Sequence, residues 1–152
     1  MLSTGFGDFP GLGGAAAVRH AAEFLDALAR EGRLRFRAPA AKTAYHDPCA
    51  LARFAPCLEP PRSLLKAALG REPLELRPWN RALASCSGEC GGFPFTFPDL
   101  ARAAAERRVA EARQAGADLL VTANPATAHH LAQAGGAFVK DLTEWAAECL
   151  VE

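Results

Sequence analysis

The sequence lacks any apolar run of about eighteen residues, the length that a membrane-spanning helix requires. Its first fifteen residues also lack the basic start and the continuous apolar core of a secretory signal. The sequence also has no excess of charge of either sign, because 17 Lys and Arg residues balance 17 Asp and Glu residues. We therefore expect a protein without a transmembrane segment and without a nucleic-acid partner, located in the cytoplasm or held at the periphery of a membrane only through partners.

Disulfides are not expected in such a protein, since the cytoplasm keeps thiols reduced. The five cysteines are Cys49, Cys57, Cys86, Cys90 and Cys149. Cys57 has no cysteine near it in the sequence and Cys149 lies on a predicted amphipathic helix, so both are expected to be small buried apolar residues. A chain of 152 residues can bury a core without disulfides or metal. We expect residues 1–14 to be a flexible Gly-rich lead-in and residues 15–152 to form a single domain.

Strands and helices alternate in the predicted order of elements. Apolar periodicity and Pro or Gly boundaries predict helices over residues 15–30, 62–69, 100–115, 127–134 and 142–151. Short apolar segments predict strands at 42–45, 74–76, 118–122 and 137–139. Asp99 is the expected N-cap of the long helix. This order predicts an α/β fold with a mostly parallel central sheet, helices on both faces and a preceding N-terminal helix.

Three loops are expected to meet at the carboxyl edge of this sheet, beginning at His46, at Cys86 after residues 82–85, and at Ala123. Thiolates suit soft metals and iron–sulfur clusters. Three residues separate Cys86 from Cys90, so the two can share a metal, with Cys49 supplied by the first loop. The candidate cofactor-binding residues are therefore Cys49, Cys86 and Cys90, with His46 or Glu89 as a further metal ligand.

Other residues carry weaker signals. Cys86 and Cys90 are also candidates for a reversible redox pair. His129 and His130 start a predicted helix near the same edge and are expected on the surface. Phe93, Phe95 and Phe97 alternate between two prolines and are expected to pack over the Gly-rich loop or against a partner. Trp79 and Trp145 are expected in the core or at an interface.

From about residue 15 to its end, the sequence resembles a family of cysteine-rich domains. This family occurs in one of the subunits of heterodisulfide reductase, in the glycolate oxidase iron–sulfur subunit and in lactate-utilisation proteins. The stretch YHDPCALAR resembles the family's His-Asp-Pro-Cys-His motif, and SCSGECGG occupies its Cys-Cys-Gly loop. The stretch RRVAEARQAGADLLVTANPATAHHL resembles the helix, strand and loop that end in Cys-Pro-x-Cys. Thirty-six residues separate Cys49 from Cys86, and thirty-six separate Ser87 from Asn124, which agrees with the family's spacing.

The ligand positions of the family are only partly kept. The resemblance implies five thiolates, which hold a non-cubane iron–sulfur cluster in heterodisulfide reductase. Cys49 and Cys86 keep their places, whereas Ser87, Asn124 and Thr127 stand where the family has cysteine. Cys90 is an addition at a position that is usually Gly. We therefore do not expect a complete cluster of the family type; an iron–sulfur cluster of another kind, zinc and no metal remain open.

These observations leave three hypotheses. The first is an accessory or electron-transfer component of an iron–sulfur oxidoreductase complex of the glycolate, lactate or heterodisulfide reductase type, which is not catalytic alone. Members of the family usually begin with ferredoxin-type domains and a first cysteine-rich repeat, so the resemblance implies ferredoxin-domain or flavin-dependent partner subunits. The second is a metal-free structural module that binds a partner. The third is a thiol redox protein that uses Cys86 and Cys90.

Overall fold

A parallel sheet lies at the centre of the computed structural model, which describes residues 18–55 and 57–151. The strands are β1 (Thr43–His46), β2 (Leu74–Glu75), β3 (Leu119–Thr122) and β4 (Val139–Asp141). They form a four-stranded sheet in the order β2-β1-β3-β4, and each neighbouring pair is parallel. The predicted class of fold is therefore confirmed.

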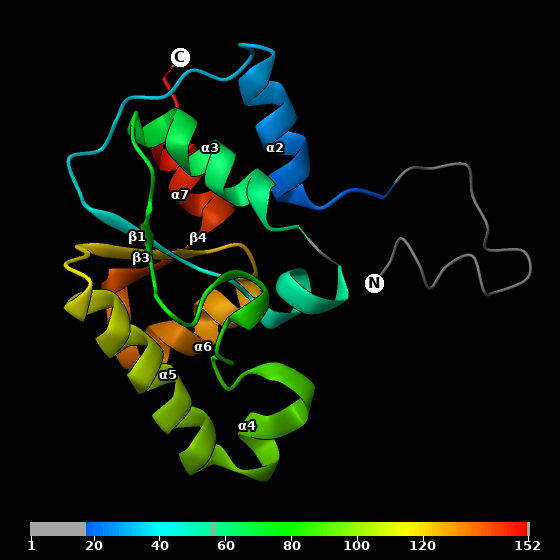
Figure 1. The fold of residues 1–152 in the computed structure, drawn as a ribbon, viewed down its shortest axis with the longest axis vertical. Helices are drawn as coiled ribbons and strands as arrows, with labels where there is room; N and C mark the ends of the chain where they lie inside the picture. The colour runs from blue at the N-terminus through cyan, green and yellow to red at the C-terminus, as the bar shows by residue number, and fades with distance from the viewer. Residues whose placement is uncertain (1–17, 56, 152) are drawn as a thin grey trace, which may run out of the picture.

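Helices cover both faces of the sheet. Helices α2 (Ala21–Arg30), α3 (Glu59–Leu69) and α7 (Leu142–Cys149) lie on one face, and α5 (Pro98–Gln114) and α6 (Pro125–Gly135) lie on the other (Figure 1). The short helix α4 (Phe93–Thr96) precedes α5. Shorter helical turns span 50–54, 81–83, 90–92 and 136–138. Helix α2 is the N-terminal helix that the sequence predicts before the first strand.

Successive residues of the central strands point to opposite faces, so each strand contributes to two cores. Tyr45 and Val121 pack with the α2, α3 and α7 side, where Trp145 is 2% exposed. Ala44 and Leu120 pack with the α5 and α6 side. Cys57 and Cys149 are buried in the first of these cores, as expected for small apolar residues.

Four helix starts differ from the predictions: α3 begins at Glu59 rather than 62, α6 begins at Pro125 rather than 127, and α2 and α5 are also shifted. Residues 1–17, which include the predicted lead-in and the first residues of the predicted helix 15–30, lie outside the described residues. Helix α2 begins at Ala21, because His20 caps it by accepting from the Ala22 amide at 3.1 Å. Asp99 is not the N-cap of α5. Pro98 opens that helix, and Asp99 in its first turn pairs instead with Arg102 at 2.7 Å.

Residues 82–85, which lead into the second loop, do not form a strand. A helical turn at 81–83 stands there, and the chain then runs in a loop to Cys86. The Ala84 carbonyl accepts from Arg53 at 2.8 Å, and the Arg81 amide donates to Asp47 at 2.7 Å. Side chains of neighbouring segments thus satisfy backbone groups here that would otherwise need a strand partner.

The end of the chain is also shifted from its predicted position. Strand β4 begins at Val139 rather than at residue 137, because a helical turn occupies 136–138. Helix α7 ends at Cys149, since Leu150 forms an antiparallel bridge with Phe36 and the Cys149 carbonyl accepts from the Arg37 amide at 2.8 Å. These bonds tie the segment after α2 to the end of the chain.

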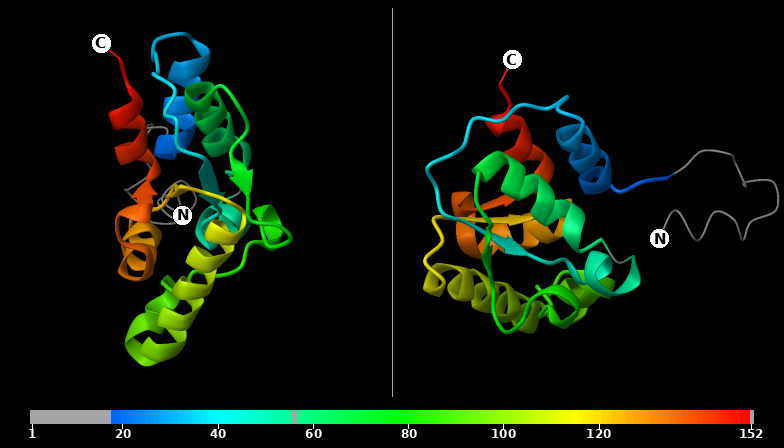
Figure 2. Two further views of the ribbon diagram at one scale, coloured as in Figure 1. Left: turned by 90° about the vertical axis from the view of Figure 1, so that its left-hand side faces the viewer. Right: turned by 45° about the horizontal axis from the view of Figure 1, so that its top comes forward.

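Helix α4 and the first turns of α5 extend away from the sheet in two different views (Figures 1 and 2). Apolar side chains are exposed on this projection. Phe95 is 92% exposed and Phe97 is 52% exposed, while the rings of Phe93 and Phe97 lie 5.6 Å apart. Phe93 and Phe97 therefore pack on each other, and Phe95 faces solvent.

Candidate functional site

The loop after β1 is held by a buried ion-pair network. Both carboxylate oxygens of Asp47 accept from Arg62 at 2.7 Å, and the side chains of Asp47 and Arg62 are 2% and 4% exposed. Arg62 also donates to Glu75 at 2.6 and 2.9 Å. Burial alone would raise the pKa of Glu75, but the hydrogen bonds from Arg62 and Asn80 hold it below its usual value. We call Asp47, Arg62 and Glu75 the carboxylate clamp; it fixes the backbone from which Cys49 projects.

The second loop is pressed against the start of α5. Gly88 has φ of 96°, and a Cβ atom at this position would lie 2.5 Å from the Ala101 carbonyl oxygen. Glycine is therefore required here for both conformation and space. Its amide donates to the Cys86 sulfur at 3.3 Å, and Ser87 beside it is buried. Cys86 itself is exposed.

The third loop is joined to the second by side chains. Asn124 caps α6 by accepting from the Thr127 amide at 3.1 Å. The hydroxyl of Thr127, which is fully buried, donates to Oε1 of Glu89 at 2.7 Å. Asn124 and Thr127, which stand where the resemblance expects cysteine, therefore both have hydrogen-bonding roles within the protein.

These loops bring two thiols and a carboxylate together. The sulfurs of Cys49 and Cys90 lie 2.9 Å apart, and these sulfurs and a Glu89 carboxylate oxygen all lie within 4.8 Å of one another. We call Cys49, Glu89 and Cys90 the thiol–carboxylate site. Cys86 and His46 are not members of this group within the described part of the chain. The three loops thus converge as expected, although the second of them follows no strand.

Electrostatics in the thiol–carboxylate site disfavour negative charge. Burial, the hydrogen bond to Cys49 and the nearby Glu89 carboxylate raise the pKa of the Cys90 thiol above its usual value. The second carboxylate oxygen of Glu89, Oε2, is buried and has no hydrogen-bond partner among residues 18–55 and 57–151. A buried acceptor without a partner costs about 1–3 kcal/mol. The site therefore offers ligand atoms for a cation, and one of them, Oε2 of Glu89, has no hydrogen-bond partner among the described residues.

His46 points toward helix α5. It is fully buried, and its Nδ1 accepts from the Arg108 guanidinium of α5 at 3.3 Å. Burial and the neighbouring Arg108 charge lower the pKa of His46 to about 3, so the ring is neutral at ordinary pH. Within the described residues its Nε2 finds no partner.

The donor set does not fit the five-thiolate cluster that the resemblance implies. Clusters of iron and sulfur are held by cysteine thiolates, four of them in the common types. Two close thiols, one carboxylate and the separate, exposed Cys86 stand at this edge. The hydroxyl of Ser87, the amide of Asn124 and the hydroxyl of Thr127 replace the other sulfurs. The chemistry of the site favours a smaller centre.

Sequence reasoning missed the partners that build this site. Arg62 and Thr127 are hydrogen-bonded to Asp47 and Glu89 across distances of 15 and 38 residues. A periodic pattern does not reveal such pairs; only the position of Thr127 in a loop expected at the same edge could have pointed to one. His130, which was expected on the surface, is instead 8% exposed and bonds the Ala101 carbonyl at 3.1 Å.

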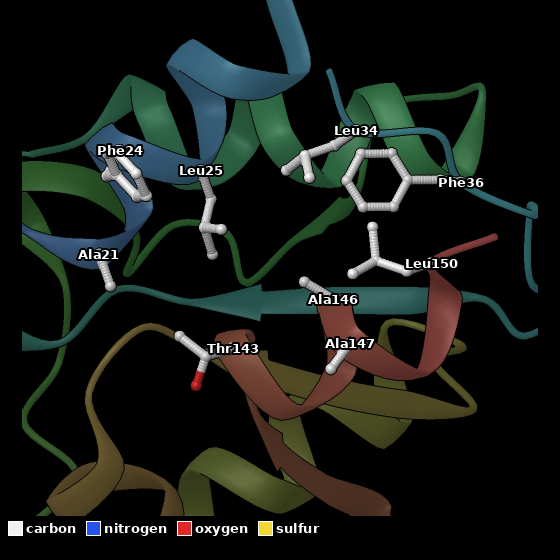
Figure 3. A pocket seen from close by; sticks show the side chains of 9 residues that line it. All are labelled: Ala21, Phe24, Leu25, Leu34, Phe36, Thr143, Ala146, Ala147 and Leu150. Carbon is white, nitrogen blue, oxygen red and sulfur yellow. The ribbon is translucent and has the colours of Figure 1, made fainter. Parts of the chain in front are cut away.

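An apolar hollow lies beside the core formed by α2, α3 and α7. Side chains of α2, of the segment after it and of α7 enclose an apolar cavity of about 260 Å³ (Figure 3). Phe24, Leu25, Phe36 and Leu150 point into it (Figure 3).

Trp79 is 45% exposed outside this region. None of the helices in the described residues has the length and apolar character needed to cross a bilayer.

The family model described as "Cysteine-rich domain" matches residues 43–132 of the chain. The matched range runs from β1 to the middle of α6 and includes all three loops of the candidate site. No solved structure shows significant similarity to the chain.

Several curated proteins of related sequence are named as oxidoreductases or as subunits of one. The chain is 37% identical over 109 residues to a subunit of the dihydromethanophenazine:CoB–CoM heterodisulfide reductase of Methanosarcina acetivorans, a match covering 71% of the chain and 26% of that protein. It is 35% identical over 86 residues to a protein of Bacillus subtilis named "probable iron-sulfur-binding oxidoreductase", covering 56% and 12%. An EtfAB:quinone oxidoreductase of Syntrophomonas wolfei is 36% identical over 86 residues, again covering 56% and 12%. The chain thus spans about a quarter or less of the length of these relatives.

Proposed function

Because the chain belongs to the cysteine-rich domain family, we propose that it is an accessory, electron-transfer component of an iron–sulfur oxidoreductase complex. The complex is of the heterodisulfide reductase type or the glycolate and lactate oxidation type. The observation that carries this proposal is the contact between Cys49 and Cys90, at 2.9 Å, in the region that the family model matches. The names of the relatives, which include a reductase subunit and a quinone oxidoreductase, support it.

Partner chains complete this proposed function. The match covers 26% of one relative and 12% of two others, so most of each relative has no counterpart in residues 43–132 or their surroundings. In the proposed complex, ferredoxin-domain or flavin-dependent subunits supply the remaining redox centres. Residues 15–152 serve as one domain that docks on them, and exposed apolar side chains such as Phe95 are suited to such a contact.

The proposed cofactor is a metal centre, either zinc or a small iron–sulfur cluster, with ligands drawn from Cys49, Cys86, Cys90 and His46. Cys49 and Cys90 have the support of geometry, because they already lie in contact. Cys86 is exposed at the same loop and is accessible to a centre shared with a partner. His46 would need its ring to turn away from Arg108 before it could reach the thiols.

Reconstitution with partner chains tests the proposal. The chain is prepared anaerobically and mixed with a ferredoxin-domain chain or a flavin-dependent chain encoded beside it in its genome. We expect a complex on size-exclusion chromatography and faster reduction of the partner's flavin by a chemical donor when the chain is present. A matched measurement uses the Phe95→Ser variant, which should weaken the complex. Absence of a complex with every such partner, together with unchanged rates, would contradict the proposal.

A metal-free partner-binding module is the second candidate function. The observation in its favour is that Asn124 and Thr127 make hydrogen bonds of their own at positions where the resemblance expects metal ligands. This candidate predicts complex formation that chelators do not affect. A thiol redox role would fall on Cys49 and Cys90 rather than on Cys86 and Cys90, because the first pair is the one in contact.

A further inference from the structure

The spacing of the donors in the thiol–carboxylate site suits one metal ion. Two thiolates on a tetrahedral zinc ion, with bonds of about 2.3 Å, lie roughly 3.8 Å apart. The Cys49 and Cys90 sulfurs, at 2.9 Å, need to separate by only about 1 Å to reach this distance. A Glu89 carboxylate oxygen already lies within 4.8 Å of both sulfurs, so the three ligand groups converge on one place.

The hydrogen bonds of Glu89 leave one of its oxygens available. Thr127 occupies Oε1 at 2.7 Å, whereas Oε2 is buried and has no partner within the described residues. A carboxylate held at one oxygen by a buried hydroxyl presents the other oxygen in a fixed direction. A cation between Oε2 and the two sulfurs would satisfy the acceptor that the protein leaves without a partner.

The composition of the site selects the class of ion. Two thiolates and one carboxylate suit zinc and similar soft divalent ions, whereas calcium and magnesium prefer oxygen ligands throughout. Two thiolates are too few for the common iron–sulfur clusters. Three protein ligands leave a fourth position for water or for a group from a partner.

We propose that Cys49, Glu89 and Cys90 bind a single divalent zinc-type ion, and that Thr127 is the positioning residue that holds Glu89. Binding replaces the thiol protons of Cys49 and Cys90, which leave to solvent. This assignment deepens the proposed function, on which it rests for its biological role. It differs from the ligand set expected from the sequence, because Glu89 enters it while Cys86 and His46 are left out.

Cobalt(II) is the probe that tests this site. The full chain is prepared anaerobically, stripped with a chelator and titrated with Co(II). We expect about one ion per chain, with thiolate-to-cobalt charge-transfer absorption and the intense visible bands of a tetrahedral ion, both abolished by Zn(II). No such absorption in the wild-type chain would overturn the inference.

Variants assign the ligands one by one. Cys49→Ser and Cys90→Ser should each abolish the charge-transfer absorption, and Glu89→Gln, which keeps an acceptor for Thr127, should weaken Co(II) binding. Thr127→Val should weaken it by about 10-fold, less than Glu89→Gln, as expected for a residue that orients a ligand. Far-UV circular dichroism of each variant confirms that the chain still folds.

Cys86→Ser separates this ligand set from the wider set of the proposed function, because only the wider set includes Cys86. It should leave the Co(II) spectrum unchanged, and loss of the spectrum would overturn the ligand set. A brown protein with iron and acid-labile sulfide in equal amounts would also overturn the inference, yet it would support the proposed redox function. Failure to bind partner chains, with an intact Co(II) spectrum, would contradict the proposed function and leave the metal site standing.

Discussion

Two clusters of charged or ionisable groups stand close together in the sequence, and they are balanced in opposite ways. In the carboxylate clamp, the Arg62 guanidinium meets the buried carboxylate of Asp47 and the partly buried carboxylate of Glu75. In the thiol–carboxylate site, the groups of Cys49, Glu89 and Cys90 all become negative when they ionise. The first cluster carries its own cation, whereas the second is suited to taking one from solution. A charged cluster that contains its own counter-charge is typical of a structural element. A cluster of acidic groups without a counter-charge is typical of a binding site.

The largest effect is expected from breaking the clamp. Arg62→Met removes the cation and leaves the buried Asp47 carboxylate and the partly buried Glu75 carboxylate without a counter-charge, which should lower the free energy of unfolding by about 3–5 kcal/mol. Urea denaturation measures this change. Arg102→Ala, which breaks the exposed pair with Asp99, is the control and should change the stability by less than about 0.5 kcal/mol. Equal losses of unfolding free energy in the two variants would show that the carboxylate clamp does not stabilise the fold.

The second large effect is a loss of stability as the pH falls. The pKa of His46 is about 3 in the folded chain and 6.5 when it is free, so only the unfolded chain binds a proton between these values. Stability is therefore full above about pH 6.5 and is lost as the pH falls toward about 3. The depressed pKa of Glu75 adds a loss at still lower pH, below its unfolded value of 4.5.

His46→Gln should flatten the part of this acid dependence between about pH 6.5 and pH 4.5, as measured by thermal unfolding across that range. His129→Gln is the control, because His129 is exposed. A steep dependence that persists in His46→Gln would place the titrating group elsewhere.

A third effect tests the uncompensated cluster directly. Zinc that binds only the folded chain should raise its unfolding free energy by about 2.7 kcal/mol when its free concentration is 100 times the dissociation constant. Melting curves with and without Zn(II), under anaerobic reducing conditions, measure this gain. The gain should vanish in Cys90→Ser and persist in Cys86→Ser; the reverse pattern would exchange the roles of the two cysteines.

The smallest effect is expected at Thr127 in the metal-free chain. Thr127→Val removes the hydrogen bond to Glu89 at nearly constant volume and should cost about 1–2 kcal/mol of unfolding free energy. Thr96→Val, at an exposed position on α4, is the comparison and should cost less than about 0.5 kcal/mol. A loss at Thr127 no larger than that at Thr96 would mean that Glu89 is not held by the hydroxyl.

Much of the fold could be predicted from the sequence because its determinants are local. The helix that ends at Gly70 and the strand at 119–122 follow from apolar patterns and glycine positions. The path of residues 81–86 could not be predicted, because Asp47 and Arg53 hold it from a distant loop. A sequence pattern does not show such long-range side-chain bonds to the backbone.

The candidate site was predicted at the level of loops and not of atoms. Spacing placed Cys49, Cys86 and Cys90 at one edge, and the structure brings Cys49 and Cys90 into contact. Left-handed turns at Gly91 and Gly92, with φ of 64° and 75°, shape the backbone directly after Cys90. The hydroxyl of Thr127 then brings Glu89 to the site. Neither effect has a periodic signature in the sequence.

The close approach of Gly88 to Ala101 has a mechanical consequence. A backbone contact that leaves no room for a methyl group cannot slide without a large cost, so the cysteine loop and the start of α5 move as one body. The projecting helix α4, with Phe95 at its surface, is the segment of chain that links them. A partner that binds this projection can therefore shift the cysteine loop, including the sulfur atom of Cys90.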